Sequence, residues 1–216
     1  MTVPQRPIAP GESWTAAIDR IGGYFDALVA RFGPDMKGID YGGRETQRVR
    51  FEIIADSFAL AGKRVLDVGC GFADLADFLA QRSPGVGYVG VDISRSVLAE
   101  ARRRRPDLDL RRLDILAEDP GGPFDVVVAN GIFYLLGAEG EARMRALIGR
   151  MFALCREGVV FTSLSSWAPR QQPGEFHADP SRTVDFCRGL TPYLRFRHDY
   201  LPHDFAVCLY RGQVPV

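Results

Sequence analysis

The sequence lacks the features that mark a membrane-spanning, secreted or nucleic-acid-binding protein. No apolar run approaches the roughly 18 residues that a spanning helix needs. The opening segment, MTVPQRPIAPGES, is polar and has no apolar stretch of the kind found in a secretory signal, so we expect a cytoplasmic protein. The 27 basic and 27 acidic side chains cancel, which leaves no net charge to attract nucleic acid or an anionic membrane.

Cysteine is also scarce. The four cysteines, Cys70, Cys155, Cys187 and Cys208, form no C-x-x-C pair and no local pair with a histidine. That spacing excludes a zinc finger or zinc ribbon, and we expect no metal. The plain interpretation is four reduced, mostly buried thiols.

The N-terminal part of the chain predicts a helical cap. Residues 1–12 hold three prolines and are expected to be a loose lead-in. An apolar stripe at helical spacing predicts a helix over residues 14–32, which the Gly-Pro pair that follows should end. After a glycine-rich link, a second helix is predicted over residues 44–61. We therefore divide the chain into a helical lid or cap, residues 1–43, and a main domain, residues 44–216.

The rest of the chain alternates short apolar strands with amphipathic helices. Nearly continuous apolar strands joined by helices predict a parallel sheet that is covered on both faces. The last two segments, 190–200 and 204–211, are joined by a gap too short for a crossover helix, so they should form an antiparallel hairpin. The other expected strands are 64–68, 86–92, 108–115, 124–130 and 158–165, and the expected helices are 72–82, 94–104 and 139–155.

The most informative segment is VLDVGCGFAD, residues 65–74, where the first strand should turn into a helix. Gly69 and Gly71 allow a tight turn and close approach of a ligand, and the helix N-terminus that follows offers free N–H groups. A dinucleotide-binding fingerprint needs a small residue at the sixth position, which here is Asp74. Asp67 would repel a pyrophosphate and attract an ammonium group. The loop favours a cofactor that carries an ammonium, although Asp67 alone could also cap the next helix.

Polar or small residues also end the following strands. Asp92 ends the second strand, 21 residues beyond the second loop glycine, where an acid can bind ribose hydroxyls. It could equally act as a helix cap. Asp114 and Ile115 end the third strand, within reach of an adenine, and Asn130 and Gly131 end the fourth. In an open α/β sheet this edge is the ligand crevice.

Together these motifs resemble those of a known family. The segments VLDVGCGFADLADFL, VDIS, LDIL and FDVVVANGIFYLL resemble the class I S-adenosylmethionine-dependent methyltransferases over roughly residues 45–165 and the terminal hairpin. The resemblance implies a Rossmann-like three-layer α/β sandwich whose seven-stranded, mostly parallel sheet ends in the antiparallel hairpin. It also implies S-adenosylmethionine as the cofactor. Ala73 departs from the pattern, since many members have a third glycine there.

The resemblance further implies where the cofactor would lie. The glycine loop and the acid before it would surround the methionine part. The acid that ends the second strand would bind the ribose, and the residue after it would pack on the adenine. The ends of the third and fourth strands would meet the adenine amino group and floor the pocket near the sulfonium. The implied cofactor-binding residues are Asp67, Gly69, Cys70, Gly71, Asp92, Ile93, Asp114, Ile115, Asn130 and Gly131.

Two segments are candidates for the acceptor site. Residues 35–47 should come over the cofactor as a lid, and the linker 165–181 follows the fifth strand at the edge where loops often select substrates. Each has a plainer interpretation, which is packing and helix capping for the first and an ordinary exposed loop for the second. The candidate acceptor-binding residues are Tyr41, Arg44, Gln47, Phe133, Trp167, Arg170 and His177.

The hairpin turn supplies the candidate catalytic residues, His198, Tyr200 and His203. The strand before the turn should run parallel to the others, so its end lies at the crevice edge. A histidine there could act as a general base, because its unperturbed pKa is about 6.5. The alternative is a histidine that is satisfied by packing within the hairpin.

The resemblance implies methyl transfer by in-line displacement, in which the protein aligns the two reacting groups and excludes water. Neutral charge and one small domain favour a small-molecule acceptor, such as a metabolite or natural-product intermediate methylated on oxygen or nitrogen. No Asn-Pro-Pro-Tyr follows the fourth strand, which argues against the amino-methylating nucleic-acid members. Two alternatives stay open: a macromolecular acceptor (RNA, protein or a carrier-bound acyl group), and a non-catalytic protein that binds a cofactor or partner. We expect the arginine cluster at residues 102–112 to lie far from the methyl group.

Overall fold

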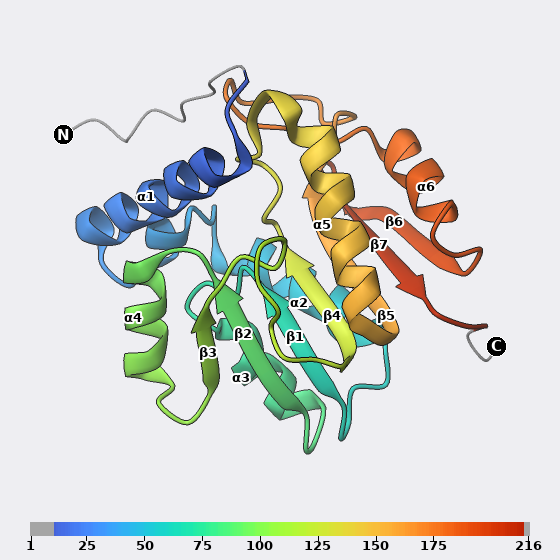
Figure 1. The fold of residues 1–216 in the computed structure, drawn as a ribbon, viewed down its shortest axis with the longest axis horizontal. Helices are drawn as coiled ribbons and strands as arrows, with labels where there is room; N and C mark the ends of the chain where they lie inside the picture. Colours follow the sequence, from blue (N-terminus) through green and yellow to red (C-terminus); the bar gives the residue numbers. More distant parts are fainter. Residues whose placement is uncertain (1–10, 214–216) are drawn as a thin grey trace.

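The computed structural model describes residues 11–213, which form one seven-stranded sheet with helices on both faces (Figure 1). The strand order is β3-β2-β1-β4-β5-β7-β6, and within these residues only β7 runs antiparallel to its neighbours. This confirms the predicted α/β sheet with its terminal hairpin. The strands are β1 (Arg64–Val68), β2 (Gly87–Asp92), β3 (Asp109–Arg112), β4 (Phe124–Asn130), β5 (Cys155–Leu164), β6 (Leu194–Leu201) and β7 (Asp204–Tyr210).

Two hydrophobic cores lie on opposite faces of the sheet. Leu66 and Val68 of β1 face one core, and Val65 faces the other, as the alternation of a strand requires. One core is covered by α5 (Gly140–Leu154) and α6 (Pro180–Arg188), and the other by α2 (Arg44–Asp56), α3 (Asp74–Arg82) and α4 (Arg95–Arg104).

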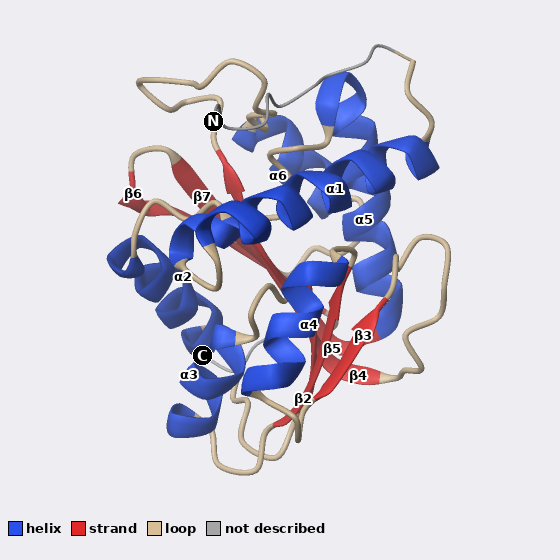
Figure 2. Cartoon of the chain, turned by 90° about the vertical axis from the view of Figure 1, so that its left-hand side faces the viewer, coloured by secondary structure: helices blue, strands red, loops and turns tan. Residues whose placement is uncertain are grey.

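Helix α1 (Trp14–Phe32) lies across the carboxyl ends of the strands (Figure 1), and Figure 2 shows it passing from the side of α2 to the side of α5. The Ser13 side chain accepts a hydrogen bond from the Ala16 N–H at 3.2 Å, and Gly33, with φ of 66°, ends the helix. These bounds match the predicted helix. The predicted proline-rich lead-in falls mostly on residues 1–10, outside the described residues.

Three predicted ends were wrong. Helix α2 stops five residues early, because Ser57 donates its hydroxyl back to Ile53 O at 2.6 Å and the Phe58 ring turns to pack on Tyr210. Strand β3 is short, because the carbonyl of Asp114 already accepts turn hydrogen bonds from the N–H groups of residues 117 and 118. Strand β5 begins at Cys155, where it pairs with Phe124 of β4.

Three short elements were not predicted. Helix α6 had a readable start signal, because Asp179 accepts hydrogen bonds from the Ser181 and Arg182 N–H groups and Pro180 follows it. Two single-turn 3₁₀ helices, η1 (Met36–Ile39) and η2 (Gly137–Glu139), lie in connections that were expected to be loops.

The cysteine prediction is confirmed, since all four thiols are free and buried. Among residues 11–213, none of the helices is long and apolar enough to cross a membrane.

Candidate active site

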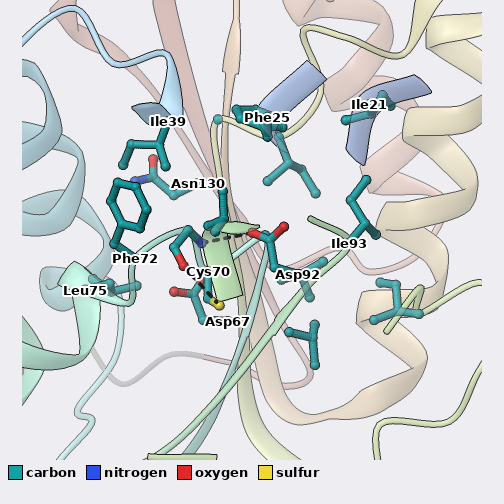
Figure 3. Close-up of a pocket in the computed structure, with 18 of the residues that line it drawn as sticks. Ile21, Phe25, Ile39, Asp67, Cys70, Phe72, Leu75, Asp92, Ile93 and Asn130 are labelled. Atoms are coloured by element: carbon teal, nitrogen blue, oxygen red, sulfur yellow. Dashed lines mark hydrogen bonds between the residues drawn. The ribbon is translucent and has the colours of Figure 1, made fainter. Parts of the chain in front are cut away.

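A cavity opens at the carboxyl ends of β1, β2 and β4, beneath α1 (Figure 3). All ten residues that the resemblance assigned to the cofactor line it: Asp67, Gly69, Cys70, Gly71, Asp92, Ile93, Asp114, Ile115, Asn130 and Gly131. Apolar side chains of α1, including Ile18, Ile21 and Phe25, form its roof, with Ile39 of η1 beside them. The cavity therefore brings together four strand ends, as the sequence predicted.

The glycine loop is held open by backbone hydrogen bonds to β2. The N–H groups of Gly69 and Cys70 donate to Val91 O at 2.8 and 3.0 Å, and Gly69 has a φ of 73°. Ala73 also lies in the left-handed region, with φ of 61°, directly before α3. A non-glycine residue there costs roughly 1 to 2 kcal/mol, which explains why a glycine suits this position.

Asp67 is buried at the floor of the cavity, with 2% of its surface exposed. Its Oδ2 accepts the Tyr88 hydroxyl at 2.6 Å, while its Oδ1 has no hydrogen-bond partner among the described residues. Burial raises the pKa of Asp67 to about 7, against the lowering effect of the Tyr88 hydrogen bond. The capping alternative is wrong, because α3 begins at Ala73 with no side-chain cap. A buried oxygen without a donor marks a place for a ligand N–H.

Asp92 orders the loop that faces it. Its Oδ2 accepts the Gly71 N–H and its Oδ1 accepts the Ser94 N–H, both at 3.0 Å (Figure 3). Burial raises its pKa, and those backbone hydrogen bonds oppose the rise. Ser94, which accepts the Val97 N–H, is the cap of α4, so Asp92 is left to face the cavity.

Trp14 is a cavity residue that the sequence analysis missed. Its indole N–H donates to Asp114 Oδ2 at 2.5 Å, while the Leu116 N–H binds Asp114 Oδ1 at 3.0 Å. Buried Arg143 of α5 fixes the start of α1 by contacting Glu12 and by donating to the Leu136 carbonyl at 2.7 Å. The sequence carried no signal for this contact, because Trp14 and Asp114 are far apart in the chain.

A second cavity adjoins the first, and Ile39, Tyr41, Gly131 and Tyr134 line both. Its other walls come from η1, α2, the ends of β4 and β5, and the hairpin turn. We call it the side chamber; its remaining lining residues are Asp40, Gly42, Thr46, Arg50, Phe133, Leu164, Glu175, His203 and Asp204.

The candidate acceptor residues divide between these cavities and the surface. Tyr41 and Phe133 line the side chamber, and Gln47 lines the first cavity, where its amide lies 3.4 Å from Asp74. The other four line neither cavity: exposed Arg44 and Arg170, half-exposed Trp167, and His177, whose Nε2 lies 3.5 Å from Glu175.

The candidate catalytic residues also separate. His203 lines the side chamber. His198 lines neither cavity; its Nε2 lies 2.8 Å from Ser165 Oγ, and its ring packs on Trp167. Tyr200 donates its hydroxyl to Asp204 Oδ1 at 2.5 Å. The topology does bring the turn to the crevice edge, because Leu164 at the end of β5 pairs with Asp204.

The side chamber contains a buried ion pair that the sequence analysis did not assign to the site. Arg50 of α2, 8% exposed, binds the fully buried carboxylate of Asp204. Burial opposes the charge on Arg50, but Asp204 and Tyr41 more than compensate, so its pKa lies above its ordinary value. The Tyr41 hydroxyl in turn accepts the Asn130 amide N–H at 2.7 Å, and Asn130 Oδ1 accepts the Thr162 hydroxyl at 2.9 Å.

Comparison with known proteins is consistent with this geometry. Residues 66–161 match the model of a methyltransferase domain. A methyltransferase candidate of Mycobacterium tuberculosis, Rv1506c, is 30% identical over 151 residues, which cover 65% of this chain and 89% of that protein. The chain belongs to the class I S-adenosylmethionine-dependent methyltransferases.

Other similar proteins share only part of their length or only the fold. A trans-aconitate 2-methyltransferase of Methylobacterium nodulans is 34% identical over 43% of this chain, which spans only 36% of that enzyme. The magnesium protoporphyrin IX methyltransferase of Synechocystis, crystallised with bound S-adenosylhomocysteine, superposes with a TM-score of 0.67 at 16% identity. It covers 91% of this chain and 100% of its own. The methyltransferase family leaves the acceptor open.

Proposed function

We propose that this methyltransferase holds S-adenosylmethionine in the first cavity and a small-molecule acceptor in the side chamber. The observation that carries the proposal is that the two cavities meet, with Tyr41 and Gly131 lining both. An acceptor in one cavity can thus reach a group bound in the other without crossing solvent.

The lining of the first cavity fits the cofactor group by group. The unpartnered Oδ1 of Asp67 can accept an N–H of the amino acid ammonium. Asp92 has carboxylate lone pairs for the ribose hydroxyls, and Asp114 can accept the adenine amino group beside the Trp14 indole. When bound, S-adenosylmethionine supplies a methyl group on a positively charged sulfonium, and the acceptor displaces the sulfur in line.

The protein's part in transfer is alignment and exclusion of water. We propose that α1 and η1, within the predicted cap of residues 1–43, act as a lid over both cavities, since Ile18, Ile21 and Ile39 already roof the first. Of the two candidate histidines, only His203 lines the side chamber, so it is our candidate for a base when the acceptor is protonated.

A small acceptor is favoured by the position of the side chamber beneath η1 and between α2 and the hairpin turn. The similar trans-aconitate 2-methyltransferase also bears the name of a small-molecule substrate. The arginine cluster that could attract a nucleic acid is largely engaged in local pairs, such as Arg105 with Asp77 and Arg111 with Asp109, and lines neither cavity.

The proposed ammonium site predicts pH-dependent cofactor binding. Because the pKa of Asp67 is about 7 and the ammonium requires the carboxylate form, we expect S-adenosylmethionine to bind about ten-fold more weakly at pH 6 than at pH values above 7. Calorimetric titration at several pH values measures this. In the absence of ligand the sign reverses: the folded protein holds this proton more tightly than the unfolded chain, so the free energy of unfolding should fall as the pH rises from about 4 to about 7.

Asp67→Asn is the matched control, since it keeps the shape and removes the titration. We expect weaker binding with a flatter pH profile between pH 6 and 7. The cofactor's own amino group titrates near about 7.8 and affects both proteins alike. Equal pH profiles for the wild type and Asp67→Asn would remove Asp67 from the ammonium site.

A further inference from the structure

The guanidinium of Arg50 stands at the junction of the two cavities. Its Nη1 lies 3.7 Å from the point that a Cβ on Gly131 would occupy, and the Tyr41 hydroxyl lies 4.0 Å from the same point. Gly131 and Tyr41 line both cavities, and Arg50 lines the side chamber. A fixed positive charge therefore lies close to where the acceptor and the cofactor meet.

Arg50 is also incompletely satisfied. One side of its guanidinium binds Asp204, but its buried Nε–H has no hydrogen-bond partner among the described residues. Side chains as buried as this one normally have every donor paired, and a donor left over on a wall of a cavity marks a place for a ligand oxygen. Asp204 cannot turn to fill that role, because it is fully buried and also accepts the Tyr200 hydroxyl.

We propose that Arg50 binds the acceptor's reacting oxygen, and that the acceptor is an oxygen acid, either a carboxylic acid or an acidic phenol or enol. This rests on the proposed function. Arg50 donates to the oxygen and stabilises its ionised form. The protein is then an oxygen methyltransferase, with Arg50 as its acceptor-binding residue.

The charge balance of transfer favours oxygen over nitrogen beside Arg50. An ionised oxygen enters with a negative charge, forms its bond to the methyl carbon and becomes neutral, while the electron pair of the broken carbon–sulfur bond stays on sulfur. No proton has to move in that step. An amine would instead become a cationic ammonium next to the guanidinium, which like-charge repulsion disfavours. An oxygen acid that is already ionised at neutral pH also needs no base.

The chamber's other charged side chains have their own partners. Asp40 accepts the Tyr24 and Tyr134 hydroxyls at 2.8 and 2.9 Å, and Glu175 lies 3.5 Å from His177. Arg50 and Asp204 neutralise each other formally, so the preference for an oxyanion comes from the local N–H donors and not from a positive chamber.

The test compares binding of three one-ring probes, benzoate, a nitrophenol and benzylamine, to the protein saturated with S-adenosylhomocysteine. The variant is Arg50→Gln with Asp204→Asn, which removes both charges of the pair and so avoids leaving either one buried alone. In the wild type we expect benzoate or the nitrophenol to bind at least about ten-fold more tightly than benzylamine, and this preference to fall to about two-fold or less in the double variant. Which acid binds distinguishes a carboxylate acceptor from a phenolic one.

Arg48→Gln is the matched control on the same helix, because the Arg48 side chain is 75% exposed and pairs only with Glu52. It should keep the wild-type preference. The proposal is overturned if benzylamine binds as well as the acids, if no acid binds, or if the double variant keeps its preference. Equal binding of S-adenosylhomocysteine to wild type and variant shows that the cofactor site is intact; its absence from the wild type would remove the proposed function and this inference together.

Discussion

Arg50→Gln is expected to lower the free energy of unfolding by about 3 to 5 kcal/mol. The substitution leaves the Asp204 carboxylate fully buried with only the Tyr200 hydroxyl to bind it, and an uncompensated buried charge is among the most costly defects in a protein. The pair joins α2 to β7, elements that are 154 residues apart in sequence. Urea denaturation at pH 7, read by circular dichroism, gives the free energy difference.

Two controls separate this charge effect from lost packing. Arg50→Gln with Asp204→Asn should recover much of the loss, because both charges are removed and the amides can pair. Arg48→Gln should stay within about 0.5 kcal/mol of the wild type, since its side chain is mostly exposed. A single variant at Arg50 that loses less than about 1 kcal/mol would mean that the pair is not buried in solution as it is here.

Gly69→Ala is expected to weaken S-adenosylmethionine binding by at least about ten-fold. Gly69 has a φ of 73°, where a Cβ costs roughly 1 to 2 kcal/mol, and that Cβ would lie 2.4 Å from Cγ2 of Ile132. Because Ile132 also lines the first cavity, relief of the clash must move the glycine loop or the cavity wall. Equilibrium titration with the cofactor measures the change in Kd.

Gly23→Ala is the control for this substitution. Gly23 lies on the exposed side of α1, and a Cβ there would have nothing within 4 Å. The change should raise stability by about 0.5 to 1 kcal/mol, as for other glycines inside helices, and leave cofactor affinity unchanged. If Gly69→Ala bound the cofactor as well as Gly23→Ala, the glycine loop would not be part of the cofactor site.

The fold was largely predictable because its signals are local. Apolar strand runs, helical stripes and the short gap before β7 each lie within a few residues, and they predicted the sheet and the hairpin. The errors occurred where tertiary contacts decide the backbone. Helix α2 ends at Asp56 because the Phe58 ring packs on Tyr210, which lies at the other end of the chain.

The site divides in the same way. The cofactor-binding residues follow directly after strands, and parallel strands must end at one edge, so their convergence could be predicted. The side chamber could not be predicted, because Arg50 has no motif around it and meets Asp204 only through the sheet order. Likewise, nothing near His198 in the sequence indicates that its ring packs on Trp167, outside both cavities.

The most direct test of the central claim is calorimetric titration of the wild-type protein and of Asp92→Ala with S-adenosylmethionine. Loss of the Asp92 carboxylate leaves ribose hydroxyls and the Gly71 N–H unpaired, at a cost of roughly 1 to 3 kcal/mol. We expect micromolar binding to the wild type, weakened about ten- to a hundred-fold in the variant. A folded wild-type protein that takes up no S-adenosylmethionine, or equal affinities for the two proteins, would contradict the assignment of this cavity.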